Sequence, residues 1–179
     1  MARLKRTEPE RQPQVRWLIR RDMDEVLEIE NGSFQFPWSE AEFLTALKQR
    51  NVIGCVYESS QDLVHGFMIY ELHKHHLRVL NLAVAPEVRR TGVGAAMVRR
   101  LVEKLSQQRR RCFLEAELRE TNLTGQLFLS RSGWRAVKVL KKHYDETNED
   151  AILFRYTLPV DEMPPTVDGS NRISQYDDP

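Results

Sequence analysis

The chain has 179 residues but only two cysteines, Cys55 and Cys112, which lie far apart and form no CxxC pair. A disulfide framework and a cysteine-rich zinc site are therefore not expected, and the reducing cytoplasm is the predicted location. The chain also lacks an apolar run near the ~20 residues that span a bilayer. Its first residues lack the apolar segment of a secretory signal, so we expect neither a membrane protein nor a secreted one.

A strong charge of either sign is absent as well. The 27 basic and 26 acidic residues leave a formal net charge of +1, which argues against a protein that binds nucleic acid by bulk electrostatics. Three neighbouring histidines, His73, His75 and His76, have no adjacent cysteine and lie in a predicted hairpin turn. We therefore expect a solvated turn there and no metal site.

Composition separates two terminal segments from the rest of the chain. Residues 1–14 hold four basic residues and two prolines, and residues 159–179 hold five acidic residues and four prolines. These segments are predicted to be a mobile basic arm and a mobile acidic, proline-containing tail. Residues 15–158 are then one domain, which is long enough to bury a substantial core.

Within this domain the hydrophobic period alternates between that of strands and that of helices. Two helix starts have the spacing of a capping box, Asp22 with Glu25 and Ser39 with Glu42. Helices are predicted at 22–29, from residue 39, after residue 86 and at 122–132; strands are predicted at 15–20, 52–57, 63–72, 77–84, 112–118, 134–140 and 151–158. Three consecutive hairpin strands followed by crossovers indicate an α/β (α+β) fold with a mixed sheet.

The most specific segment runs from the predicted central strand into the long helix. Gly92 and Gly94 allow the backbone to approach a ligand closely. The first turn of a helix presents unpaired N–H groups and a positive dipole end, which suits a pyrophosphate, and Arg89 and Arg90 add positive charge. The alternative is a helix start that contains glycine and has two solvated arginines.

The pattern Arg89-x-x-Gly92-x-Gly94, after a strand that ends Ala83-Val84, resembles the acetyl-CoA signature of the GCN5-related N-acetyltransferase (GNAT) family. The resemblance implies a mixed, mostly antiparallel seven-stranded sheet, splayed after its central strand, with about four helices. It also implies that the pantetheine arm of acetyl-CoA bonds to the central strand and that the following loop holds the pyrophosphate. The implied cofactor-binding residues are Leu82, Ala83, Val84, Arg89, Arg90, Thr91, Gly92, Val93, Gly94, Ala95 and Asn122.

Further segments resemble the branch of this family that acetylates the N-terminal alanine of a ribosomal protein. They are Phe36-Pro-Trp-Ser-Glu40, the acidic-x-Arg-x-x-Asn motif from Glu117 to Asn122, and Tyr144. The match makes Glu117 the expected general base, which would deprotonate an α-amine whose pKa is about 7.7–8.0. Glu117 is alternatively a salt-bridged strand residue, and Asn122 is alternatively a helix N-cap.

One position departs from the family pattern. Leu129 stands seven residues after Asn122, where the family places a tyrosine that protonates the departing thiolate. Tyr144 is a candidate substitute acid, or alternatively a wall of the substrate groove. A thiol has a pKa near 8.5, so the thiolate is a fair leaving group and solvent can protonate it.

The resemblance places the substrate between the loop that joins the first two helices and the last hairpin. Phe36, Pro37, Trp38 and Tyr144 are the expected substrate-binding residues, although the first three also suit a hydrophobic lid on the second helix. We expect direct acetyl transfer from acetyl-CoA to a primary amine, here a protein N-terminus or peptide, by a monomer or dimer. A small-molecule amine acetyltransferase and a non-catalytic acyl-CoA-binding module are the alternatives, and the acyl-chain preference stays open.

Overall fold

The computed structural model describes residues 12–108 and 111–158. Most of the predicted arm and the whole predicted tail lie outside this part of the chain. One seven-stranded sheet has the order β1-β2-β3-β4-β5-β7-β6, and all its neighbours are antiparallel except β4 and β5. The strands are β1 (Gln14–Trp17), β2 (Val52–Glu58), β3 (Val64–Leu72), β4 (His76–Val84), β5 (Phe113–Arg119), β6 (Arg135–Tyr144) and β7 (Glu149–Thr157).

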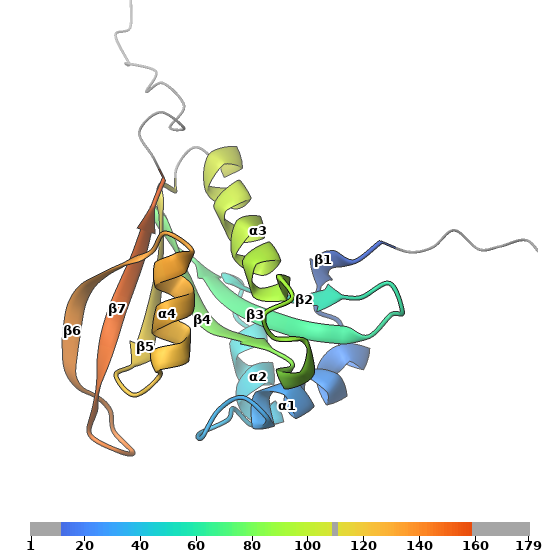
Figure 1. Ribbon diagram of the computed structural model, residues 1–179, viewed down its shortest axis with the longest axis horizontal. Coiled ribbons are helices and arrows are strands. Elements are labelled where there is room, and N and C mark those ends of the chain that lie inside the picture. Colours follow the sequence, from blue (N-terminus) through green and yellow to red (C-terminus); the bar gives the residue numbers. More distant parts are fainter. Residues whose placement is uncertain (1–11, 109–110, 159–179) are drawn as a thin grey trace, which may run out of the picture.

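Four helices connect these strands: α1 (Met23–Asn31), α2 (Glu40–Leu47), α3 (Val93–Gln108) and α4 (Leu123–Arg131), with 3-10 turns η1 (Arg20–Asp22) and η2 (Pro86–Val88). Figure 1 shows that α1 and α2 lie on one face of the sheet while α3 and α4 lie on the other. The fold class predicted from the sequence is therefore confirmed.

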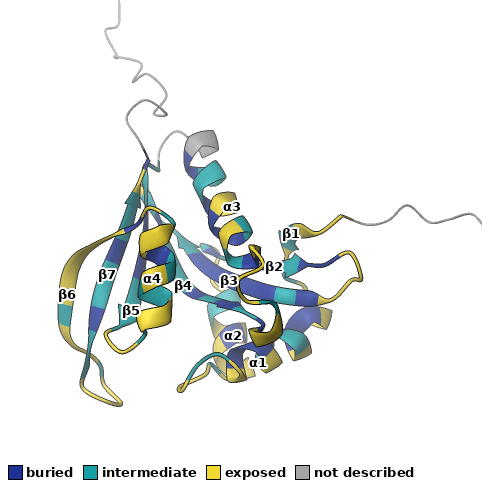
Figure 2. Cartoon of the chain, in the orientation of Figure 1, coloured by how far each residue is buried: buried dark blue, intermediate teal, exposed yellow. Residues whose placement is uncertain are grey.

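Each face of the sheet has its own hydrophobic core. The core under α3 includes Val93, Met97, Leu101 and Leu105, which are buried as their i+4 spacing predicts. The core under α1 includes Val26 and Phe43 together with inward side chains of β2 and β3. Figure 2 shows the buried stripe along α3 and the contrasting exposure of the edge strand β6.

The sheet opens between β4 and β5. Their parallel pairing runs only from His76–Phe113 to Val79–Ala116. The pairing of β3 with β4 shifts at the same point, because Tyr70 opposes Val79 while Ile69 opposes Asn81, so Leu80 is an extra residue on β4. Beyond this bulge β4 and β5 diverge, as Figure 1 shows, and the backbone of Leu82–Val84 has β3 on one side and no strand on the other.

One of the two predicted capping boxes is wrong. Ser39 and Glu42 bond reciprocally at the start of α2, as predicted. At the start of α1, however, Asp22 makes no side-chain cap bond. Its carboxylate instead accepts hydrogen bonds from both terminal nitrogens of Arg16, at 2.6 and 2.9 Å. A charge-assisted pair of bonds is stronger than a neutral cap bond, which explains the outcome.

The last hairpin is longer than predicted. β6 continues to Tyr144 and β7 begins at Glu149, so Tyr144 ends a strand and pairs with Glu149 instead of lying in a loop. β6 is an edge strand with nearly all its side chains exposed. It consequently lacks the alternation of apolar and polar residues that marks a half-buried strand.

Candidate functional site

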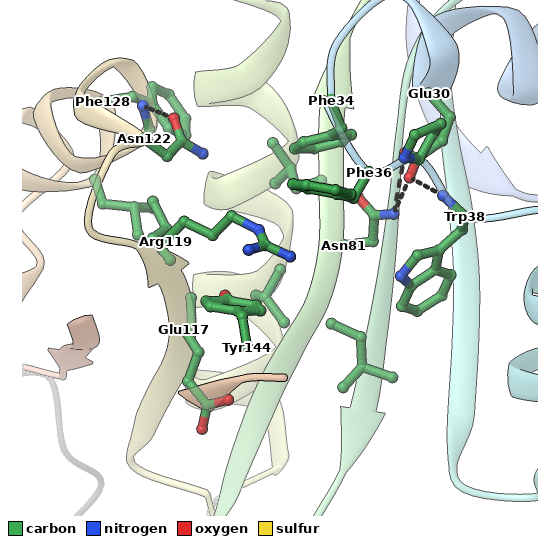
Figure 3. Close-up of a pocket in the computed structure, with 18 of the residues that line it drawn as sticks. Glu30, Phe34, Phe36, Trp38, Asn81, Glu117, Arg119, Asn122, Phe128 and Tyr144 are labelled. Carbon is green, nitrogen blue, oxygen red and sulfur yellow. Dashed lines mark hydrogen bonds between the residues drawn. The ribbon is translucent and has the colours of Figure 1, made fainter. Parts of the chain in front are cut away.

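A pocket of about 380 Å³ runs through the opening between β4 and β5. Its walls come from both faces of the sheet, because residues of α3 and α4 line one end and residues of α1 and the α1–α2 loop line the other (Figure 3). The predicted site residues among its lining are Leu82, Phe36, Pro37, Trp38, Glu117, Asn122 and Tyr144. The other predicted residues lie at the end of β4 and the start of α3, outside the lining.

The start of α3 has the form of an anion site. Arg90 and Gly92 adopt positive φ angles of 70° and 100°, and the Ala96 N–H donates to the Gly92 carbonyl at 2.9 Å to begin the helix. The N–H groups of the first helical turn have no partner within the helix. A Cβ at Gly92 would meet nothing within 4 Å, so the space in front of this turn is open.

Two other residues of this segment have structural partners. A Cβ at Gly94 would lie 3.2 Å from the ring of Phe128, so this glycine lets α4 pack against α3. Arg89 donates from Nε to the Val84 carbonyl at 3.0 Å and from Nη2 to Ser33 Oγ at 2.9 Å. Its guanidinium therefore ties the end of β4 to the segment after α1.

Asn122 is the N-cap of α4 and also a residue of the pocket lining. Its Oδ1 accepts a hydrogen bond from the Gly125 N–H at 2.9 Å and caps α4, while the residue also lines the pocket. Figure 3 shows its amide nitrogen turned toward the opening. Leu129, at the position of the family's tyrosine, is 7% exposed and packs in the core with Trp134.

One carboxylate oxygen of Glu117 contacts two basic side chains. Its Oε2 lies 2.7 Å from Arg78 Nη2 and 3.0 Å from His143 Nε2. Arg78 lies on β4 and His143 lies on β6. Both contacts are on the face of the sheet that carries α1 and α2, in the part beyond β4 that these helices do not cover. Figure 3 shows its carboxylate pointing away from Asn81 and Trp38.

Arg119 joins the two predicted substrate segments. Its guanidinium carbon lies 3.8 Å from the ring centroid of Tyr144 and 4.6 Å from that of Phe36, which are cation–π distances. It also bonds to Glu149 Oε2 at 3.1 Å and to Thr147 Oγ1 at 3.0 Å. The α1–α2 loop and the last hairpin are thereby linked across the mouth of the pocket (Figure 3).

The environment of Tyr144 makes its hydroxyl a weaker acid. Burial raises the pKa of this phenol above its ordinary value of 10.0, and the nearby carboxylates of Glu117 and Glu149 act in the same direction. The side chain is therefore protonated throughout the neutral range.

Sequence reasoning missed two polar residues in the pocket wall, Glu30 and Asn81. They are 1% and 8% exposed, and Asn81 Nδ2 donates to both carboxylate oxygens of Glu30 at 3.1 and 3.0 Å. The backbone N–H of Trp38 donates to Glu30 Oε1 at 2.8 Å, which anchors the α1–α2 loop.

A signal for both residues was present. Glu30 follows Met23, Val26 and Ile29 on the buried face of α1, so it is an acid at a core position. Asn81 interrupts the apolar run of β4.

Within the described ranges, no helix is long and apolar enough to cross a bilayer. The same residues contain no cluster of three or more histidine, cysteine, aspartate or glutamate side chains suited to a metal ion.

Comparison with known proteins places the chain in a family. Residues 13–134 match the model of the acetyltransferase (GNAT) family. An uncharacterized N-acetyltransferase of Methanocaldococcus jannaschii is 29% identical over 140 residues, covering 78% of this chain and 88% of the relative. The [ribosomal protein bS18]-alanine N-acetyltransferase of Escherichia coli (strain K12) is 26% identical over 141 residues, covering 78% and 92%.

A solved structure has the same fold. Arabidopsis thaliana NAA60 in complex with acetyl-CoA superimposes with a TM-score of 0.72 at 14% identity, covering 82% of this chain and 100% of that one. The family model spans more than half of the sequence, and the open sheet and helix start described above agree with it. The chain is a member of the acetyltransferase (GNAT) family.

Proposed function

We propose that this chain transfers the acetyl group of acetyl-CoA to the N-terminal α-amine of a protein, by direct attack in a ternary complex. The observation that carries the proposal is the pocket that passes through the opening between β4 and β5. It allows donor and acceptor to enter from opposite faces of one sheet and to meet in the middle. Relatives named [ribosomal protein bS18]-alanine N-acetyltransferase support this acceptor.

The chain's own groups fit acetyl-CoA, the source of the activated acetyl group. The backbone of Leu82, Ala83 and Val84 faces no strand on the β5 side, so the amides of a pantetheine arm can pair there by strand addition, next to the Val84 carbonyl that already accepts a hydrogen bond from Arg89. The segment from Arg90 to Ala95 offers the pyrophosphate a helix N-terminus with open space at Gly92. Asn122 directs its amide nitrogen into the same opening.

The end of the pocket that is lined by the α1–α2 loop and the last hairpin binds the acceptor amine in this proposal. Phe36, Pro37, Trp38 and Tyr144 form the substrate end of the pocket, and the Arg119 bridge fixes the spacing of Phe36 and Tyr144. Rings at this position grip a peptide end and exclude water from the reacting amine. The predicted cytoplasmic location and a monomeric or dimeric state belong to this proposal.

Glu117 is the proposed general base. The ion pair with Arg78 and the contact with His143 hold its carboxylate in place. Because its carboxylate points away from the pocket centre, the proton of the amine reaches it through water. Substitution Glu117→Gln should lower kcat about 100-fold near neutral pH and leave acetyl-CoA affinity unchanged. An unchanged kcat would remove Glu117 from the mechanism.

The acceptor class is tested by release of free CoA thiol with a panel of amines at one concentration. The panel contains short peptides that differ in their first residue, the same peptides with a blocked N-terminus, free amino acids and polyamines. Higher kcat/KM for unblocked peptides supports the proposal. Faster turnover of the free amines would indicate a small-molecule acetyltransferase, and acetyl-CoA binding without turnover would indicate a non-catalytic module.

A further inference from the structure

The bulge in β4 decides which way Asn81 faces. Residues two apart on a regular strand share a face. Val79 and Asn81 do not, because they oppose Tyr70 and Ile69, which are neighbours on β3 and therefore face opposite sides. The extra residue Leu80 thus turns Asn81 away from the α3 core and toward α1, the side from which the acceptor enters.

Glu30 is a buried carboxylate that forms no ion pair among the residues the structure describes. Two nitrogens donate to it instead: the Trp38 backbone N–H bonds to Oε1, and the Asn81 amide nitrogen contacts both carboxylate oxygens. Burial raises the pKa of Glu30, while these hydrogen bonds oppose the rise by favouring the ionised form. An ionised carboxylate carries no proton, so its hydrogen-bond partners must donate.

This requirement fixes the amide of Asn81. Its nitrogen must face Glu30, so the carbonyl oxygen Oδ1 lies on the opposite side of the planar amide group, as in Figure 3. Among the described residues Oδ1 accepts no hydrogen bond, and Asn81 belongs to the pocket lining. The pocket wall therefore presents a fixed hydrogen-bond acceptor at the point where β4 leaves β5.

We propose that Asn81 Oδ1 binds the acceptor amine through one of its N–H groups, and that Glu30 is a positioning residue that holds the Asn81 amide in this orientation. The inference rests on the proposed function for its substrate. An attacking amine has N–H donors and one lone pair. A hydrogen-bond acceptor in the pocket wall binds one N–H of the amine and leaves the lone pair of the amine free. An amide nitrogen at the same place would instead donate to that lone pair and compete with the acetyl carbon for it.

Substitution Glu30→Gln tests the orientation. A glutamine at this position can donate to Asn81 Oδ1, so the amide turns over and presents its nitrogen to the pocket. We expect KM for the amine to rise about 10-fold or more, because one hydrogen bond to a polar group is lost. The affinity for acetyl-CoA should not change. Asn81→Leu should raise KM similarly. In the swapped pair Glu30→Gln with Asn81→Asp, an acceptor oxygen again faces the pocket, and KM should fall back toward the wild-type value.

A matched control exists elsewhere in the sheet. Asn51 Nδ2 donates to Glu71 Oε1 at 2.7 Å, outside the pocket, so Glu71→Gln disturbs the same kind of pair without touching the acceptor. All variants are compared in the full chain with whichever amine of the panel the wild type acetylates fastest, and each melting temperature is measured. A KM that is unchanged in Glu30→Gln, or that follows the melting temperature across the variants, would overturn the inference. Absence of turnover with any unblocked peptide would count against the proposed function instead, because the free amines still test Asn81.

Discussion

At the scale of single residues, the site departs from the family pattern at one position. The tyrosine that protonates the thiolate in the family is replaced by Leu129, which is buried in the core and can donate nothing. Tyr144 lies near enough to line the pocket, but its raised pKa makes proton donation to a thiolate, whose conjugate thiol has a pKa near 8.5, unfavourable. We therefore propose that Tyr144 is a residue of the substrate groove and that solvent protonates the thiolate.

Two substitutions of Tyr144 test this assignment. Tyr144→Phe keeps a ring on Arg119, so kcat should stay within about 2-fold of the wild type. Tyr144→Ala removes the ring and should raise KM for the peptide, because the cation–π contact is lost. Steady-state kinetics with one peptide measures both. A fall in kcat of about 100-fold in Tyr144→Phe would instead identify the hydroxyl as a general acid.

At the scale of secondary-structure elements, a buried ion cluster joins β1, η1 and β2. Arg16 bonds to Asp22 and, at 2.6 Å, to Glu58, and the two acidic side chains are 3% and 6% exposed. Burial alone would raise the pKa of Asp22, but its hydrogen bonds with Arg16 and the Ile19 N–H lower it below the ordinary value. The bond with Arg16 also lowers the pKa of Glu58.

Substitution Arg16→Met should lower the free energy of unfolding by about 3 kcal/mol at pH 7, because it removes the cation that is hydrogen-bonded to two buried carboxylates. The lowered pKa values mean that this stabilisation is present above the unfolded-state values of 3.8 and 4.5 and is lost as pH falls through the folded-state values. The difference between variant and wild type should therefore narrow below about pH 4 in urea titrations. Arg21→Met is the control, since Arg21 is 71% exposed and lies 3.9 Å from Asp22. An equal loss in both variants would contradict the cluster's role.

The start of α3 gives a second prediction at this scale. Gly92→Glu places a negative side chain in the open space before the helix, so acetyl-CoA affinity should fall about 100-fold or more through charge repulsion and blockage. Gly92→Ala is the matched control, because it carries the same strain at a φ of 100° without the charge. Calorimetric titration with acetyl-CoA measures both. Equal affinity in the two variants would mean that the phosphates bind elsewhere.

The helices and strands also show which features could be predicted from the sequence. The i+4 spacing along α3 and the Ser39–Glu42 box depend on neighbours along the chain, so both were predicted correctly. The Asp22 cap was wrong because Arg16, on another element, bonds to that carboxylate. Asn81 was missed because its direction depends on a bulge, and a bulge is defined by the pairing with β3.

At the scale of the whole molecule, the opening in the sheet is what unites the site. β1–β4 and β5–β7 are joined through only four residue pairs of β4 and β5, and α3 and α4 cover one face of the opening while the α1–α2 loop and the last hairpin meet across the other. The helix start was proposed from its glycines and arginines, with an alternative left open, and the aromatic residues were proposed from family resemblance, since the sequence alone does not tell which segments meet. Arg119 and the Glu30–Asn81 pair appear only when these segments are placed together.

In the proposed reaction the acetyl group passes to a peptide α-amine. The most direct measurement is tandem mass spectrometry of one peptide that begins with alanine and carries an internal lysine, after incubation with the full chain and acetyl-CoA. Our account predicts an acetyl group on the first residue and an unmodified lysine, with no product from the same peptide bearing a blocked N-terminus. Acetylation of the lysine in both peptides, with a free α-amine in the first, would contradict it.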